Sequence, residues 1–323
     1  MKNWKSKLLS TSFFLIAFLL FSCKEILTDI KIELPTPKPK FVVHSTFTPF
    51  TPPVVKSFSV FVSRNAKVFD TLKIDPITDA TVKLFVDGQY DQVLKFYPVN
   101  SNYVTKFHYY PKVGVEYSVS VEKQGFETVT AKGVIPEKVT IENCKLIPFA
   151  GIDQDKLAFS QISVSFDDPA DQTNYYEIMV LGYMNENDKK KLYTTDKVIT
   201  SESYYPSQVD FAANQPKRLL FSDKLINGEN HVVDLTYKCP QEGQSGGLAI
   251  IPHLIFLSFR SVSESYYRYY TNLFKQINNR EIDMLFGMAE PSPVYTNIEN
   301  GYGVFAGYSE DNRSFWVDSI RVR

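Results

Sequence analysis

The segment Val115–Glu122 has the sequence Val-Glu-Tyr-Ser-Val-Ser-Val-Glu, in which apolar and polar residues alternate without a break. Because successive side chains of a β-strand point to opposite faces, this alternation predicts a strand with one buried and one solvated face. The same period recurs at Ser57–Ser63. Ala80–Val86 ends at Asp87-Gly88, a two-residue hairpin signal that precedes the next predicted strand, Gln92–Tyr97. These segments indicate antiparallel β-structure.

Three further segments complete the pattern, namely Phe41–Phe47, Tyr103–Phe107 and Phe126–Val134. Seven short strands within about 95 residues, separated by turn residues, are typical of an immunoglobulin-like β-sandwich. Pro136 ends the series. We therefore predict such a sandwich over residues 41–136, as an architecture and not as an ancestry, because the Cys and Trp pairing of antibody domains is missing.

Residues 137–323 form the second predicted domain, which is also β-rich. Ser261 and Glu264 have the spacing of a capping box, and aromatic residues then recur at helical intervals, which predicts one helix over residues 264–279. The predicted strands are Phe159–Phe166, Asn174–Tyr183, Gly228–Tyr237, His253–Val262 and a closing pair, Tyr302–Tyr308 and Ser314–Val322, joined by Ser309–Arg313. The chain contains 25 Phe and 20 Tyr but 14 Gly, a balance that favours a mainly β fold.

The N-terminus has the pattern of a lipoprotein signal peptide over residues 1–22. Three lysines precede the apolar run Leu8–Phe21, and the small residue Ser22 stands directly before Cys23. The run is short for a membrane span. The alternatives to a lipoprotein signal are an ordinary secretory signal and a short membrane span. We expect cleavage before Cys23 and acylation of its thiol by fatty acids that include palmitate. The acyl chains would then anchor the protein to a lipid bilayer.

Residues 23–40 are predicted to be a tether, because Pro35, Pro37 and Pro39 keep the chain extended. Removing 22 of 323 residues leaves 301, enough for two domains. The net charge falls from −1 to −4 as three lysines are lost, which is too weak to imply a nucleic-acid partner.

Two cysteines, Cys144 and Cys239, remain after acylation of Cys23. An oxidising envelope could join them, and in the loop-entropy model the bridge would stabilise the fold by about 4 kcal/mol. Two separate thiols are the alternative, because the sequence does not show whether their Cα atoms come within bridging distance.

No segment indicates catalysis. A Gly-x-Ser-x-Gly elbow, a phosphate-binding glycine loop and a His-Glu-x-x-His motif are all missing, and the four histidines are scattered. The acidic loop Asp167–Asn174 lacks the glycine and final glutamate of an EF-hand and favours a solvated turn. Trp316, in a terminal alternating strand, favours a core or edge position over a sugar platform. We predict a non-enzymatic protein without cofactor or metal.

Four segments of the chain stand out together, in this order: Phe166-Asp167-Asp168-Pro169 with Asn174-Tyr175-Tyr176, Phe221-Ser222-Asp223-Lys224 before Asn227-Gly228, Ser265-Tyr266-Tyr267-Arg268-Tyr269-Tyr270, and Asn297-Ile298-Glu299-Asn300-Gly301-Tyr302-Gly303-Val304-Phe305. Together they resemble the domain-of-unknown-function family DUF4249 of Bacteroidetes lipoproteins. The resemblance implies an outer-membrane lipoprotein found alongside TonB-dependent receptors, and it supplies no catalytic residues. Lys24-Glu25 resembles, incompletely, a surface-export signal, which slightly favours the cell surface and leaves the periplasmic face open.

The leading hypothesis is an outer-membrane accessory or binding component of a TonB-dependent nutrient uptake system. The alternative is a surface adhesive or structural lipoprotein with no transporter partner. Candidate residues for a partner or ligand surface are Tyr175, Tyr176, Tyr266 and Tyr267, provided that these aromatic side chains cluster and are exposed.

Overall fold

The computed structural model describes residues 38–49, 57–65, 75–106, 109–182, 189–202, 216–243, 248–286 and 293–322. The chain divides into two compact units, Met1–Lys38 and Pro39–Arg323, and every element named below lies in the second. The predicted signal peptide, Cys23 and nearly all of the tether lie outside the described residues.

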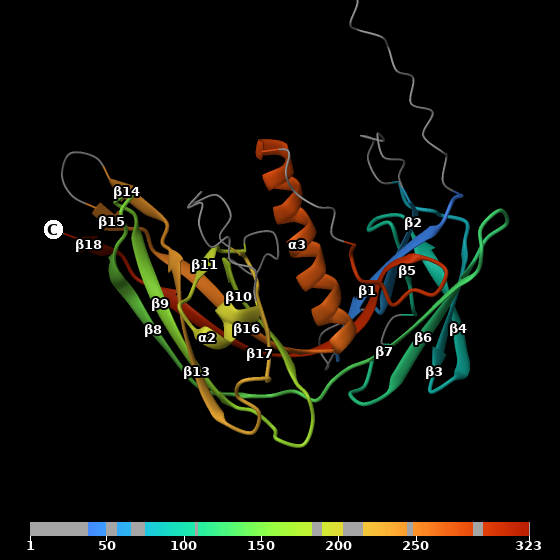
Figure 1. The fold of residues 1–323 in the computed structure, drawn as a ribbon, viewed down its shortest axis with the longest axis horizontal. Coiled ribbons are helices and arrows are strands. Elements are labelled where there is room, and N and C mark those ends of the chain that lie inside the picture. Colours follow the sequence, from blue (N-terminus) through green and yellow to red (C-terminus); the bar gives the residue numbers. More distant parts are fainter. Residues whose placement is uncertain are drawn as a thin grey trace, which may run out of the picture. The chain divides into compact units, whose positions relative to one another are not determined.

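The described part is mainly β, with a long helix in its C-terminal half, as predicted (Figure 1). The first strands are β1 (Phe41–Phe47), β2 (Ser59–Arg64), β3 (Thr81–Val86), β4 (Gln89–Tyr97), β5 (Asn102–Val104), β6 (Glu116–Glu122) and β7 (Val129–Val134). The next are β8 (Ile141–Ile152), β9 (Ala158–Asp167), β10 (Tyr175–Gly182), β11 (Leu192–Tyr193), β12 (Leu219–Ser222) and β13 (Asn230–Lys238). The chain continues through β14 (Gln241–Gly243), β15 (Leu248–Ile250), β16 (His253–Val262), β17 (Tyr302–Val317) and β18 (Ile320–Val322), and the helices are α2 (Lys197–Glu202) and α3 (Glu264–Phe286).

The alternation in β6 works as predicted. Tyr117, Val119 and Val121 are buried, while the residues between them are partly exposed. The hairpin signal is confirmed too, because Asp87 and Gly88 both have positive φ, 48° and 76°, and connect Val86 to its partner Gln89. A two-residue turn with positive φ at both positions matches the right-handed twist of the paired strands.

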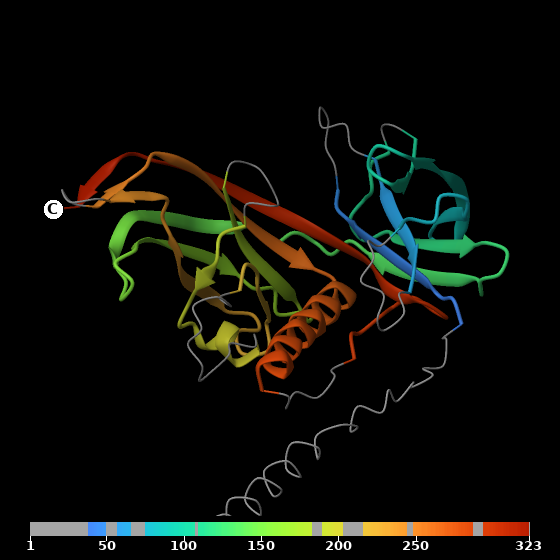
Figure 2. The ribbon, with the colours of Figure 1, turned by 90° about the horizontal axis from the view of Figure 1, so that it is seen from above.

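One sheet of 11 strands contains strands from both predicted domains, in the order β12-β10-β16-β17-β1-β2-β5-β4-β3-β6-β7. Figure 2 shows the long strand β17, drawn in red, running from one group of strands to the other. Its neighbours β1 and β17 are parallel, with Val42 opposite Tyr302. Two smaller sheets have the orders β11-β13-β9-β8 and β14-β15-β18. The C-terminal strand β17 therefore pairs directly with the first strand of the chain.

A first core lies among the strands from β1 to β7 and includes Phe41, Phe47, Val60, Leu84 and Val119. It also takes up two residues from the far end of the chain, Ile298 and Phe305. The phenyl ring of Phe305 lies 4.8 Å from that of Phe47 and 5.8 Å from that of Phe58, measured between ring centroids. The core that begins at residue 41 is thus completed by β17.

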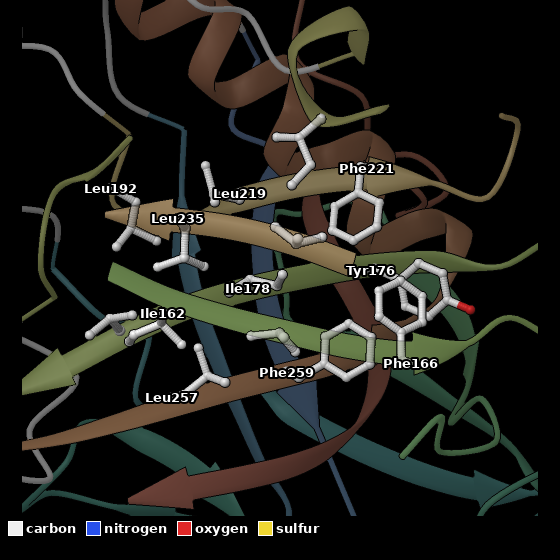
Figure 3. Close-up of a cluster of buried hydrophobic side chains, with 14 of the residues drawn as sticks. Ile162, Phe166, Tyr176, Ile178, Leu192, Leu219, Phe221, Leu235, Leu257 and Phe259 are labelled. Atoms are coloured by element: carbon white, nitrogen blue, oxygen red, sulfur yellow. The ribbon is translucent and has the colours of Figure 1, made fainter. Parts of the chain in front are cut away.

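A second core fills the space between the sheet β11-β13-β9-β8 and the strands β12, β10 and β16 (Figure 3). Phe166, Tyr176 and Phe259 form its aromatic centre, with ring centroids 4.7 to 5.3 Å apart. Burying one such aromatic ring contributes about 1.5–3 kcal/mol. These strands form two layers around one apolar interior, as alternating patterns predict.

The predicted closing pair is wrong in one respect, because Ser309–Arg313 does not form a connection. The chain is strand from Tyr302 to Val317, and only then turns into β18. The polar residues that suggested a loop have partners: Asp311 Oδ2 accepts from Ile141 N–H at 2.9 Å, and Arg313 Nη2 donates to Ile141 O at 2.8 Å. They link β17 to the first residue of β8, a strand that the sequence pattern did not predict.

Candidate functional site

A row of charged residues crosses three adjacent strands of the large sheet. Glu177 on β10 lies opposite Arg260 on β16, and Arg260 lies opposite Glu310 on β17. Side chains on one face of neighbouring strands interact directly, so the row alternates acid, base, acid. Glu177 is fully buried and Arg260 is 6% exposed, whereas the side chain of Glu310 is 27% exposed. Charged side chains that are buried in the protein interior need ion-pair or hydrogen-bond partners.

The helix α3 covers this row and supplies the next partner. It packs on β17, β10 and β12, and Tyr266 in its first turn donates from its hydroxyl to Glu177 Oε2 at 2.8 Å. The other Glu177 oxygen, Oε1, accepts from Arg218 Nη1 at 2.9 Å, and Arg260 Nη1 lies 3.2 Å from Oε2. Both oxygens of this carboxylate are therefore bound to donors.

The guanidinium groups also stack on tyrosine rings. Arg218 lies 4.4 Å from the ring centroid of Tyr270, and Arg260 lies 4.3 Å from that of Tyr308. Arg260 Nε lies 3.2 Å from Glu310 Oε2. Cation–π contacts of this kind strengthen when they are desolvated. We call Glu177, Arg218, Arg260, Tyr266, Tyr270, Tyr308 and Glu310 together the docking cluster, because it lies where α3 meets the sheet.

The two arginines and two of the tyrosines in the docking cluster keep their protonation states at neutral pH. Burial alone would lower the pKa of Arg260, but Tyr266, Tyr308, Glu177 and Glu310 raise it well above its usual range. Burial raises the pKa of Tyr266 well above its ordinary value, and that of Tyr270 to about 12. Arg218 and Arg260 thus stay charged, and Tyr266 and Tyr270 stay neutral. Such groups hold a structure together but are poorly placed to exchange protons.

The four predicted surface tyrosines divide into two pairs. Tyr176 and Tyr266 are 0% and 1% exposed, so the predicted exposed surface does not hold for them. Each instead binds a carboxylate, Asp168 and Glu177 respectively. Tyr175 and Tyr267 are partly exposed and stack on each other with a centroid distance of 4.8 Å.

Glu202, the last residue of α2, holds the Tyr175–Tyr267 stack in place through a hydrogen bond to Tyr267. Tyr267 OH donates to Glu202 Oε2 at 2.9 Å, and the same carboxylate accepts from the Ser222 amide at 2.7 Å and from the Ser222 hydroxyl at 2.6 Å. Burial raises the pKa of both tyrosines. Glu202 thereby links α3, α2 and the edge strand β12.

The acidic loop after β9 is held to the turn after β12, so two of the family-like segments meet. Asp168 accepts from the Tyr176 hydroxyl and, at 2.9 Å, from the Gly228 amide. Asp223 Oδ2 accepts from the Asn174 amide at 2.6 Å, and burial raises the pKa of its carboxyl. These acids are occupied as backbone acceptors. Across the described ranges no group of three or more His, Cys, Asp or Glu residues is arranged to hold a metal ion.

The segment Asn297–Phe305 closes the first core. Asn297 accepts from the Phe305 amide at 3.0 Å and donates to the carbonyl groups of Phe305 at 2.7 Å and Lys132 at 3.0 Å. Gly303 has φ +109°, and a Cβ there would collide with Val43 O, so this position requires glycine. The motif joins β17 to both β1 and β7.

The two cysteines are free. Cys144 pairs with Val164 on one side of β9, whereas Cys239 follows β13 on the other side, with its Sγ 2.9 Å from Ser160 Oγ. Two strand spacings amount to about 9.5 Å, beyond the roughly 7 Å limit for Cα atoms in a disulfide. Of the two alternatives that the sequence left open, the structure therefore has the two separate thiols. Burial raises the pKa of Cys144 to about 11, which makes it a weak nucleophile.

Two features of the site were missed from the sequence. The first is the charged row, although a signal was present: Glu177 interrupts the apolar run of β10, and Arg260 is the one Lys, Arg, Asp or Glu residue in β16. The second is Arg218, which lies just before a four-residue strand and carried no pattern. Trp316, by contrast, lies near the end of β17, beyond the stretch that pairs with β1, and is 60% exposed.

In the described part of the chain, no helix is both long and apolar enough to cross a membrane. Comparison with solved structures gives only weak likenesses. Parabacteroides merdae β-glucuronidase matches with 11% identity over 70% of this chain and 24% of the enzyme, at a TM-score of 0.21. A Corynebacterium diphtheriae protein described as membrane anchored matches with 10% identity over 70% of this chain and 55% of its own, also at 0.21. The chain thus spans about a quarter of the enzyme.

Comparison with curated proteins finds no matching relative. The family model described as "Domain of unknown function (DUF4249)" matches residues 27–314. This range includes the docking cluster, the Glu202 contacts and the closing motif, and it covers all four segments from which the resemblance was inferred. The chain belongs to the DUF4249 family.

Proposed function

We propose that the protein is a lipid-anchored, non-catalytic component of the outer membrane that works beside a TonB-dependent transporter in nutrient uptake. The observation that carries the anchor is Leu20-Phe21-Ser22-Cys23 behind a basic, apolar N-terminus. Membership of DUF4249 supports the setting, because the resemblance that led to this family implies such lipoproteins. Acylated Cys23 would hold the chain at the membrane.

The reach of the anchor supports a role at the membrane surface. Fifteen residues separate Cys23 from Pro39, where the compact unit begins. A fully extended chain of this length spans at most about 50 Å. The folded unit would therefore begin within about 50 Å of the membrane, which suits a partner in or close to the same membrane, such as a transporter.

The contacts around α3 support a non-catalytic role. The carboxylates of Glu177, Glu202 and Asp168 are each bound to two or more donors of the protein itself. A general acid or base needs a carboxyl that can reach a substrate proton. These groups instead fix the positions of strands and helices, as is expected in a scaffold that presents a surface.

Metabolic labelling with a palmitate analogue tests the anchor. We expect label on the wild-type chain and none on Cys23→Ser, with Cys144→Ser as the matched control that keeps the label. Label that persists in Cys23→Ser would contradict lipidation at this residue. Membrane fractionation of the same strains should show that only Cys23→Ser leaves the outer membrane.

Co-purification tests the partner. The C-terminally tagged chain is isolated from gently solubilised outer membranes, with an unrelated tagged lipoprotein as the control, and bound proteins are identified by mass spectrometry. We expect a TonB-dependent receptor at near-equal abundance. Recovery of no receptor above the control would reject the transport role, and an attachment defect on gene loss with normal uptake would favour the adhesive alternative.

A further inference from the structure

A partly buried histidine lies at the edge of the docking cluster and has no role in the proposed function. His44 on β1 lies opposite Val304 of β17 and Phe61 of β2. Its Nε2 is 3.3 Å from the Tyr270 hydroxyl, and its ring is 6.1 Å from that of Tyr269 and 6.5 Å from that of Tyr270. Both tyrosines belong to α3. His44 is thus a contact between the first strand and the helix.

We infer that His44 makes the docking of α3 dependent on pH: protonation of its imidazole weakens the hold of the helix on the sheet. In the neutral tautomer that carries its proton on Nδ1, Nε2 accepts a hydrogen bond from the Tyr270 hydroxyl. In the charged ring both nitrogens are donors, so this bond is lost unless the hydroxyl reverses. The helix itself covers the histidine, and its release would return the imidazole to water.

The charges around His44 oppose a further positive charge. On α3 the facing groups are the neutral hydroxyls of Tyr269 and Tyr270, and β17 and β2 place Val304 and Phe61 opposite it. Arg218, just before β12, places its positively charged guanidinium 4.4 Å from the ring centroid of Tyr270. Glu177 on β10 has both oxygens bound by other groups. In the portion of the chain described, no ion pair joins His44 to a carboxylate.

The net charge of the docking cluster also disfavours protonation of His44. The docking cluster holds two arginines and two glutamates, so it is neutral overall, and a protonated His44 would add a third cation. Burial, and then the charge of Arg218, lower the pKa of His44 below its ordinary value. The released state therefore binds the proton more tightly than the docked state, and a fall in pH favours release.

The helix can be released locally because its contacts form a cluster of their own. Tyr266 and Tyr270 pack with Leu220, Val262, Val304, Ala306 and Tyr308, apart from the two main cores. From Lys275 onward the described side chains of α3 are exposed. Segments with few buried apolar contacts open at lower free energy than the global fold. The two sandwich-like cores need not unfold when α3 leaves.

Hydrogen exchange of the α3 amides tests the inference. The full mature chain, in detergent micelles, is compared at pH 7.5 and pH 5.0 after correction for intrinsic exchange rates. The opening constant of α3 should rise at the lower pH, by up to about tenfold for each unit by which the docked pKa lies below 6.5. Amides of β6 and β9 should show no such rise. Equal α3 opening at the two pH values would overturn the inference.

Two variants identify the titrating group. His44→Gln keeps a polar side chain without the titration, and it should make α3 opening independent of pH. His253→Gln is the matched control, because His253 on β16 also has a pKa lowered by burial and also meets a tyrosine, with Nε2 3.2 Å from Tyr237 OH. It should keep the α3 response. A response that disappears in His253→Gln and persists in His44→Gln would refute the assignment.

A direct titration keeps the inference testable if His44→Gln fails to fold. The imidazole resonance of His44 in the wild-type chain is followed by NMR against pH, with Tyr270→Phe as the partner variant. A pKa below 6.5 that moves toward 6.5 when the Tyr270 hydroxyl is removed supports the inference. A wild-type pKa at or above 6.5 contradicts it, because docking would then favour the protonated ring.

Discussion

The two faces of β10 are buried by different chemistry. Toward the second core the strand presents Tyr176, Ile178 and Val180, which meet apolar side chains from the opposite sheet. Toward α3 it presents Glu177, which meets two arginines and a tyrosine hydroxyl. An apolar face accepts any partner of suitable shape, whereas a buried carboxylate accepts only donors in the right places. The comparison teaches that the cores supply stability and the charged face selects one helix in one position.

The largest effect is expected from the apolar face. Phe259→Ala removes a fully buried ring at the aromatic centre of the second core and should reduce the free energy of unfolding by about 3–5 kcal/mol. Chemical denaturation of the mature chain measures this loss. The α3 contacts should persist in the variant that still folds, so Tyr266, which is 1% exposed, should stay shielded from solvent. Early loss of that shielding would show that the two faces are not independent.

A smaller change on the charged face of β10 should reduce the free energy of unfolding almost as much. Glu177→Gln keeps the shape of the side chain but leaves Arg218 and Arg260 without their shared carboxylate, and we expect a loss near the lower end of about 3–5 kcal/mol. Glu116→Gln is the control, since its pair with Lys132 is exposed and contributes less than about 1 kcal/mol. Equal effects of the two variants would mean that the buried row is not what holds α3.

A matched pair of hydroxyl deletions sharpens the comparison. Tyr176→Phe and Tyr266→Phe each remove one buried hydroxyl that donates to a carboxylate, one on each face. Each should lower the free energy of unfolding by about 1–3 kcal/mol. Only Tyr266→Phe should also increase hydrogen exchange along α3. If both variants loosen α3 to the same degree, the role assigned to the charged face is wrong.

The smallest effect is expected at the solvent side of α3. Arg268 pairs with Glu264 one turn earlier at 3.4 Å, and more than half of each side chain is exposed. Arg268→Ala should change the free energy of unfolding by less than about 0.5 kcal/mol from this pair, and less still in high salt. Because Arg268 also lies over the ring of Tyr295, a larger salt-independent loss would reveal that contact.

Sequence patterns predict the strands that bury an apolar face well, and they predict the contacts of polar residues poorly. Strands with one buried face, such as β6 and β9, follow the alternation of their residues closely. The pattern fails at β8, most of whose residues are exposed or half-buried, and at residues 309–313 of β17, where Asp311 and Arg313 bind the backbone of Ile141. Period-two reasoning treats every polar residue as solvated, and it therefore misses polar groups whose partners are distant in the sequence.

The candidate site shows the same limit. The sequence pointed to Tyr175, Tyr176, Tyr266 and Tyr267, and all four lie at or beside contacts that involve α3 or β10. It did not reveal that two are buried, because burial depends on the helix and sheet coming together. Nor could it join Glu177 to Arg260 and Arg218, which are 83 and 41 positions away along the chain.

The parallel pairing of β1 with β17 sets an order of events during synthesis. Val42 and Tyr302 are partners although 260 positions separate them. When the first seven strands have left the ribosome, the strand that supplies Phe305 and closes their core has not yet been made. Contacts over such distances form slowly, and an unpaired strand edge is prone to aggregate while it waits. A chaperone that shields the β1 edge until β17 is available to pair with it would therefore favour a high yield of folded protein.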